Sequence, residues 1–115
     1  MKIELDQNEK EQLIRDVMEN FPEASEAGGV PCIDWDYEKT EFVFVDSEGE
    51  KPQEVTVNME SLLKGLDKMW ADIGVKYFNG NPDITQETMT DPCNWDANDA
   101  NALVEYTLYG EVIYG

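Results

Sequence analysis

The stretch that decides the fold is Met59–Ile73, which reads MESLLKGLDKMWADI. Its apolar residues recur at the spacing of one face of an α-helix. Those residues are Met59, Leu62, Leu63, Leu66, Met69, Trp70 and Ile73. Asn58 stands where a helix N-cap belongs, and Gly74 stands where a left-handed residue commonly ends a helix. The pattern predicts an amphipathic helix whose apolar face needs a partner.

The opposite side of this helix is charged. Glu60 with Lys64, and Lys68 with Asp72, are pairs of opposite charge four positions apart. Such pairs face each other on a helix surface and contribute modestly to its stability. These pairs indicate that the face of the predicted helix opposite its apolar stripe is exposed to solvent.

Three short segments ahead of this helix have the pattern of β-strands. Ile33, Trp35 and Tyr37 alternate with acidic residues, which is typical of a half-buried strand. Residues 42–45 are a run of aromatic and β-branched residues, and Val55 with Val57 belongs to a third alternating segment. Their short connections favour an antiparallel meander. Residues 75–78 are a candidate fourth strand.

Two further helices are expected. Residues 7–21 carry an apolar stripe, and Asp6 with Glu9 resembles a capping box. Residues 98–110 begin with Asn98, a good N-cap residue, followed by Asp99. The Val, Tyr and Thr content of residues 103–114 also suits a strand, so both alternatives stay open there. The predicted fold class is α+β: a three- or four-stranded antiparallel meander packed by about three helices.

The apolar residues of these elements define an expected core. It contains Trp35, Phe42, Phe44, Val55, Val57, Leu62, Leu66 and Trp70. A chain of 115 residues is long enough to bury such a core, and residues 1–115 are expected to form a single domain.

Charge is the most unusual property of the chain. Asp and Glu number 26 against 8 Lys and Arg, which gives a net charge of −18. A hydrophobic content of 41% favours a folded domain over a disordered acidic tail. No apolar run has the length of a signal peptide or a membrane span, so a cytoplasmic location is expected. An anionic surface is repelled by nucleic acid and by anionic membranes, so direct binding to either is not expected.

The residue types argue against a cofactor, a metal site or an enzyme. The two cysteines, Cys32 and Cys93, are expected to be reduced thiols, and the chain has no histidine. Too few Cys and His ligands exist for a zinc site. Asp34 and Asp36 have the spacing of paired catalytic carboxylates, but among 26 acidic residues such a pair arises by chance. No phosphate-binding loop or catalytic triad motif is present.

A weak calcium-loop pattern begins at Asn94. Asp96, Asn98 and Glu105 fall at positions 3, 5 and 12 of such a loop, but Asp99 stands where glycine is required. A capped helix start explains the same residues without a metal ion. Weak calcium binding therefore remains only an alternative.

The acidic surface is the leading functional candidate. Its expected partner-binding residues form one group on the first helix and one around the first two strands: Glu9, Asp16, Glu19, Asp34, Asp36, Glu38 and Glu41. Rows of fixed carboxylates can present a field comparable to that of nucleic-acid phosphates. The sequence therefore predicts a non-enzymatic mimic of nucleic acid that inhibits a basic, DNA- or RNA-binding protein such as a defence nuclease.

An immunity- or antitoxin-type partner of a basic toxin or enzyme is the second candidate. In such a complex a few aromatic residues carry much of the affinity. Trp95 and Tyr114 are the expected anchors, provided that they are exposed. Both hypotheses require a basic protein partner, and neither fixes the oligomeric state.

Overall fold

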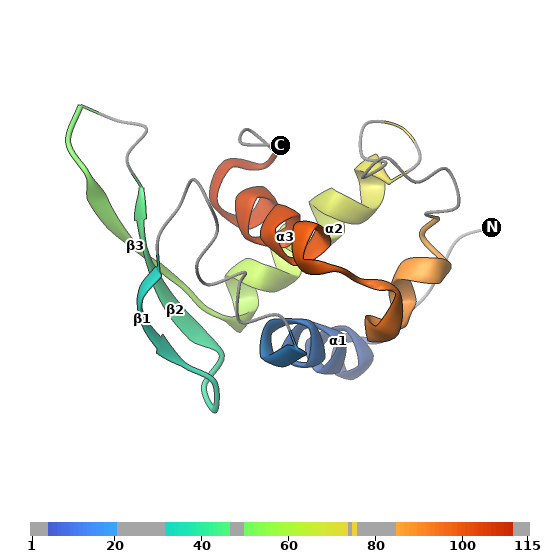
Figure 1. The fold of residues 1–115 in the computed structure, drawn as a ribbon. Coiled ribbons are helices and arrows are strands. Elements are labelled where there is room, and N and C mark those ends of the chain that lie inside the picture. The colour runs from blue at the N-terminus through green and yellow to red at the C-terminus, as the bar shows by residue number, and fades with distance from the viewer. Residues whose placement is uncertain (1–4, 21–31, 47–49, 74, 76–84, 112–115) are drawn as a thin grey trace.

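A three-stranded antiparallel sheet stands at one end of the molecule, and three α-helices lie on one side of it (Figure 1). The structure, a computed structural model of the chain, describes residues 5–20, 32–46, 50–73, 75 and 85–111. Its elements are α1 (Gln7–Asn20), β1 (Cys32–Asp36), β2 (Glu41–Asp46), β3 (Gln53–Val57), α2 (Met59–Asp72), η2 (Thr88–Thr90), η3 (Pro92–Asn94) and α3 (Ala97–Tyr109). The predicted α+β class is confirmed. The candidate fourth strand falls almost wholly on residues outside the described ranges.

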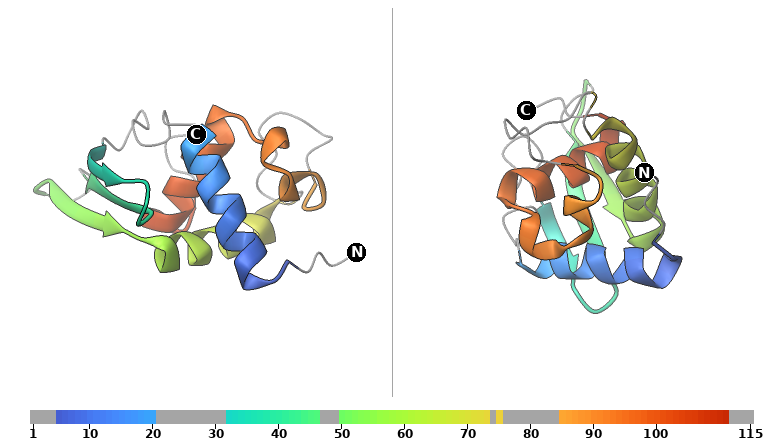
Figure 2. Two further views of the ribbon diagram at one scale, coloured as in Figure 1. Left: turned by 90° about the horizontal axis from the view of Figure 1, so that it is seen from below. Right: turned by 90° about the vertical axis from the view of Figure 1, so that its right-hand side faces the viewer.

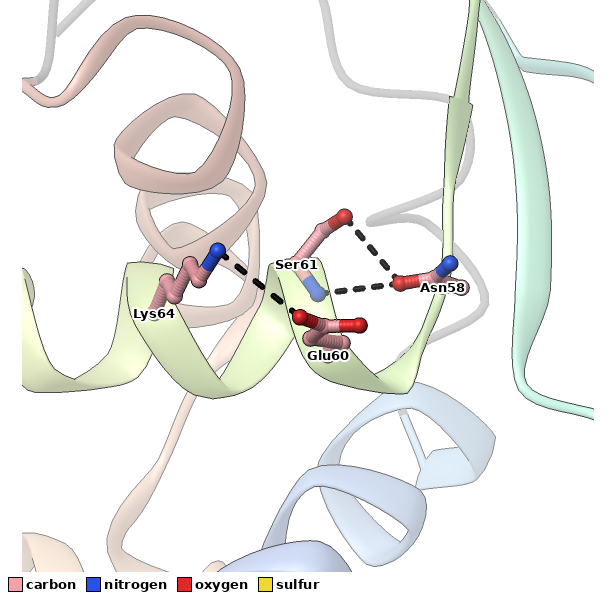
Figure 3. A network of polar contacts seen from close by, with 4 residues as sticks. All are labelled: Asn58, Glu60, Ser61 and Lys64. Atoms are coloured by element: carbon pink, nitrogen blue, oxygen red, sulfur yellow. Dashed lines mark hydrogen bonds and ion pairs between the residues drawn. The ribbon is translucent and has the colours of Figure 1, made fainter.

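The central helix α2 begins as its sequence predicts. The Asn58 side chain caps it by accepting from the backbone N–H of Ser61 at 3.0 Å and from its hydroxyl at 3.1 Å (Figure 3). On the solvent side, Glu60 and Lys64 form the expected pair at 3.8 Å. The helix ends with Ile73 as its C-cap in an extended conformation, and Gly74 lies outside the described residues.

The helices α2 and α3 pack very closely. A Cβ atom built on Gly65 of α2 would lie 2.9 Å from the Cα and the backbone N of Thr107 on α3. Two backbones can approach this far only where one residue has no side chain. Helix α1 crosses this pair and contacts α2 (Figure 2).

Two hydroxyl groups of α3 tie it to the other layers. The Tyr106 hydroxyl donates to Asp72 at the end of α2 at 2.8 Å, and the Tyr109 hydroxyl donates to Asp46 at the end of β2 at 2.9 Å. Apolar packing also joins the helices to the sheet. Phe42, Phe44 and Val57 belong to the same buried cluster as the helical residues.

Most of the expected core is confirmed. The residues Phe42, Phe44, Val57, Leu62, Leu66 and Trp70 are all buried. Val55, on the outer strand β3, is only half-buried.

The prediction that Trp35 belongs to the core is wrong, since 55% of its surface is exposed. The strand register is irregular between Cys32 and Asp34, so that Cys32 pairs with Phe44 and Trp35 pairs with Phe42. Trp35 therefore lies on the same side of the sheet as buried Phe42, yet the burial that Phe42 receives does not extend to it. Among the described strands β1 has a neighbour on one side only, so Trp35 is less covered than Phe42 on the central strand β2.

The last helix, α3, is a helix throughout, so the strand alternative is wrong for residues 103–109. Its N-cap is Asp96 rather than the expected Asn98. The Asp96 carboxylate accepts from Asp99 N–H at 2.9 Å, and the Asp99 carboxylate accepts from Asp96 N–H at 3.0 Å. This reciprocal arrangement is a capping box built from two aspartates. Asn98 is exposed in the first turn.

The capping box that the sequence indicates for α1 is confirmed. The backbone N–H of Glu9 donates to the Asp6 carboxylate at 2.8 Å, and the N–H of Asp6 donates to the Glu9 carboxylate at 3.4 Å. The buried residues Leu13, Ile14, Val17 and Met18 form the predicted apolar stripe. Phe21, the last residue of that stripe, lies outside the described residues.

Candidate protein-binding surface

Carboxylates gather on the outer face of the sheet. Because strand residues alternate between two faces, the inward direction of Phe42 and Phe44 sets their neighbours on β2 outward. The pairing places Asp34 opposite Val43 and Asp36 opposite Glu41, while Glu54 of β3 lies opposite Val45. By this register the acids share one face of the sheet, and the helices lie on the other side of the sheet (Figure 1). The structure thus brings Asp34, Asp36 and Glu41 onto one surface.

Asp36 and Glu41 form the closing pair of the β1–β2 hairpin. Like charges directly opposite each other in a sheet are unfavourable. The Asp36 carboxylate accepts from the backbone N–H of Lys39 at 3.2 Å, which offsets part of this cost. Ion pairs in the described part of the chain, Lys10–Asp67, Arg15–Glu11 and Lys64–Glu60, lie on α1 and α2. None of these neutralises the sheet face.

Glu38 lies in the turn between β1 and β2 and is exposed. The same turn holds Thr40 at a φ of 53°, a left-handed conformation that is unusual for a β-branched residue. Thr40 is buried, and the ring of Tyr37 contacts that of Phe42 edge-on at a centroid distance of 5.6 Å. The turn is therefore anchored to the core, which holds Glu38 next to the acids of the outer face.

The acidic residues of α1 form a separate group. Glu9 belongs to the capping box, Asp16 accepts from the side-chain amide of Gln12 at 2.9 Å, and Glu19 is exposed. Helix α1 lies on the helical side of the sheet, away from the outer face (Figure 1). The seven predicted residues therefore divide between two surfaces instead of forming one.

The sequence prediction missed the exposed apolar residues of β1. Ile33 and Trp35 are 50% and 55% exposed, and they interleave with Asp34 and Asp36 along β1. The backbone N–H of Trp35 donates to the Asp34 carboxylate at 2.9 Å. The two acidic residues that flank Trp35 in the sequence indicated that its side chain could be exposed. The position of β1 at the edge of the sheet and its bulge cannot be predicted from the alternation of residues.

The predicted aromatic anchors are not supported. Trp95 is buried, and its indole N–H donates to the backbone carbonyl of Met89 at 2.8 Å, so it does not meet the condition of exposure on which its role as an anchor depended. Tyr114 lies outside the described residues.

The residues of the weak calcium-loop pattern have structural roles in α3. Asp96 caps α3 as described above, and Glu105 is buried within that helix. Among the described residues, no group of three or more His, Cys, Asp or Glu side chains is placed to hold a metal ion. The capped helix start accounts for this stretch.

Both cysteines carry free thiols. Cys93 is exposed, while Cys32 is half-buried and its thiol donates to the backbone carbonyl of Asp34 at 3.2 Å. Burial raises the pKa of the Cys32 thiol above its usual value. This environment favours the protonated thiol, which is the less nucleophilic form.

Within the described ranges, the helices are too short or too polar to cross a membrane. Comparisons of the chain with protein-family models, with curated proteins and with solved structures find no match.

Proposed function

We propose that the protein is a non-enzymatic inhibitor that imitates nucleic acid and occupies the basic groove of a DNA- or RNA-binding protein, such as a defence nuclease. The single observation that carries this proposal is the carboxylate face of the sheet, formed by Asp34, Asp36 and Glu41 with Glu38 beside them, which takes part in none of the ion pairs between described residues. The net charge of −18 has the sign that such a groove attracts.

The spacing of these carboxylates supports the proposal. Residues two apart on a strand are separated by about 6.6 Å, and neighbouring strands by about 4.8 Å. Phosphates along one DNA strand recur about every 3.4 Å of helix axis, so alternate phosphates have a repeat close to that of Asp34 and Asp36. Carboxylates fixed on strands lose little conformational entropy on binding. A basic groove would therefore meet charges already held at a suitable separation.

An immunity- or antitoxin-type partner of a basic enzyme is the second candidate function. The exposed side chain of Trp35 favours it, because tryptophan is enriched among the residues that dominate protein–protein affinity. Phosphate mimicry alone would not require an exposed indole on the strand that carries Asp34 and Asp36.

Affinity capture followed by competition tests the leading function. The immobilised protein is incubated with lysate at about 50 mM and about 200 mM salt, and duplex DNA is then added. We expect a basic protein to be retained, its retention to fall steeply at the higher salt concentration, and duplex DNA to displace it. A captured protein that binds DNA and this chain simultaneously would contradict mimicry.

Charge reversal at matched positions locates the binding face. Glu41→Lys changes the outer face of the sheet, whereas Glu87→Lys changes an exposed residue next to η2 at the far end of the helical half. Both variants alter net charge equally. We expect Glu41→Lys to slow association more strongly, because local complementarity steers the encounter. Equal effects would mean that only total charge matters.

A further inference from the structure

The exposed tryptophan lies on β1, an edge strand of the sheet that the described residues form. The strand order is β1-β2-β3, so among the described strands β1 has a neighbour on one side only. Ile33 and Trp35, both at least half exposed, alternate along this edge with Asp34 and Asp36. An edge strand that exposes apolar side chains is a template for pairing with another strand.

We propose that β1 is the docking edge for an extended basic segment of the partner protein, which adds to the sheet beside β1. This inference rests on the proposed function in requiring a basic partner, and it names the element by which that partner binds. Strand side chains alternate between two faces, so the segment places Lys or Arg beside Asp34 and Asp36 and apolar residues beside Trp35. The recognised sequence is therefore one in which basic and apolar residues alternate.

The backbone at Trp35 explains why a basic strand is needed. Its N–H already donates to the Asp34 carboxylate, so an incoming carbonyl group must displace that contact. A Lys or Arg side chain that pairs with Asp34 draws the carboxylate away and leaves the N–H free to donate to the new strand. The edge is closed to a neutral strand and opened by a basic one.

Charge also decides against a second copy of this chain on the edge. Two β1 strands side by side would bring the carboxylates of Asp34 and Asp36 from both copies together, on molecules that each carry −18. Like charges across paired strands are unfavourable. The bulge at Ile33 further twists the start of the strand, which also discourages pairing between copies. The complementary occupant is a basic segment.

Three synthetic peptides of equal charge test strand addition. The first alternates arginine and valine, the second has the same composition in two blocks, and the third is the alternating peptide with its backbone amides N-methylated. Calorimetry is expected to show the alternating peptide binding at least roughly tenfold more tightly than either control, because only it can form the new ladder of hydrogen bonds with matched side chains. Equal binding of all three peptides would overturn the proposal.

The position of the bound peptide is a second readout. We expect the backbone amide signals of residues 33–37 to shift in NMR spectra on addition of the alternating peptide, with those of β3 unchanged. Trp35→Ser should lower the affinity for the alternating peptide by roughly tenfold. Val75→Ser is the matched control, since Val75 is 71% exposed but follows α2 far from β1. Shifts centred on β3, or equal weakening by both variants, would overturn the proposal.

These outcomes separate strand addition from the proposed function. If the peptides bind alike while Glu41→Lys still weakens capture of a basic partner, strand addition is wrong and the inhibitor function stands. If Glu41→Lys and Glu87→Lys weaken capture equally, the assignment of the acidic sheet face is wrong, whatever the peptides do. Self-association of the chain through β1, seen as dimers that Trp35→Ser abolishes, would also overturn the proposal that a basic segment docks on β1.

Discussion

At the scale of single residues, Gly65 sets the distance between α2 and α3. Alanine is normally the better helix former, by about 1 kcal/mol. Here its methyl group would lie 2.9 Å from the Thr107 backbone, so α3 would have to move. We expect Gly65→Ala to lower the free energy of unfolding by about 1–3 kcal/mol, as measured by chemical denaturation.

The matched double variant checks this explanation. Thr107→Ala removes the side-chain part of the clash but leaves the Thr107 Cα and N atoms in place. The combination of Gly65→Ala with Thr107→Ala should therefore recover only part of the loss. Full stability of Gly65→Ala alone would mean that α2 and α3 are far enough apart to accept a methyl group between them.

Tyr106 links the stability of the helical layer to alkaline pH. Burial, followed by its hydrogen bond to Asp72, raises the pKa of Tyr106 above the usual value of about 10. The folded state therefore retains this proton longer than the unfolded state does. Its contribution to stability is complete below about pH 10 and is lost as the pH rises through the folded-state pKa.

Phenolate absorbance measures this effect. The chain has 5 tyrosines, and we expect one of them to ionise at higher pH than an exposed tyrosine in the folded protein and near pH 10 after unfolding. The late-ionising group should be absent from Tyr106→Phe. A titration curve identical in the variant would assign the shifted group to another residue.

At the scale of elements, two nearby residues at the start of α3, Asp96 and Asn98, should differ in their contribution to stability. Asp96→Ala removes the acceptor for Asp99 N–H, and loss of an N-cap costs about 0.5–2 kcal/mol. Asn98→Ala should change stability little, because Asn98 is exposed within the helix. Thermal unfolding of both variants measures the difference. A larger loss for Asn98→Ala would restore the N-cap assignment that the sequence favours.

Helices and strands differ in how far the sequence predicts them. The stripe of α2 and its Asn58 cap depend on contacts within a few residues, so local spacing identifies both. The side of the sheet on which Trp35 lies can be read from alternation, but its exposure depends on β1 being at the edge and on how far the helices reach. These are tertiary properties. For the same reason, the sequence indicates the seven acidic residues but not their division between two surfaces.

At the scale of the whole molecule, the net charge of −18 opposes compaction. Salt screens repulsion between surface charges, with a screening length of about 30 Å at 0.01 M and about 8 Å at 0.15 M. We expect the melting temperature to rise when sodium chloride is increased over this range. Glu41→Lys, which removes part of the repulsion at the sheet face, should show a smaller rise. A melting temperature independent of salt would mean that the carboxylates are too far apart to repel significantly.

The facing carboxylates of Asp36 and Glu41 have a consequence for the order in which the molecule opens. They weaken the hairpin at the point where β1 and β2 are joined, whereas α2 and α3 are held together by apolar packing and by the Tyr106 hydroxyl. Amide hydrogens of β1 should therefore exchange with solvent through local fraying, at a lower free energy than those of α2. In kinetic terms, we expect the proposed docking strand to sample open conformations more often than α2 does.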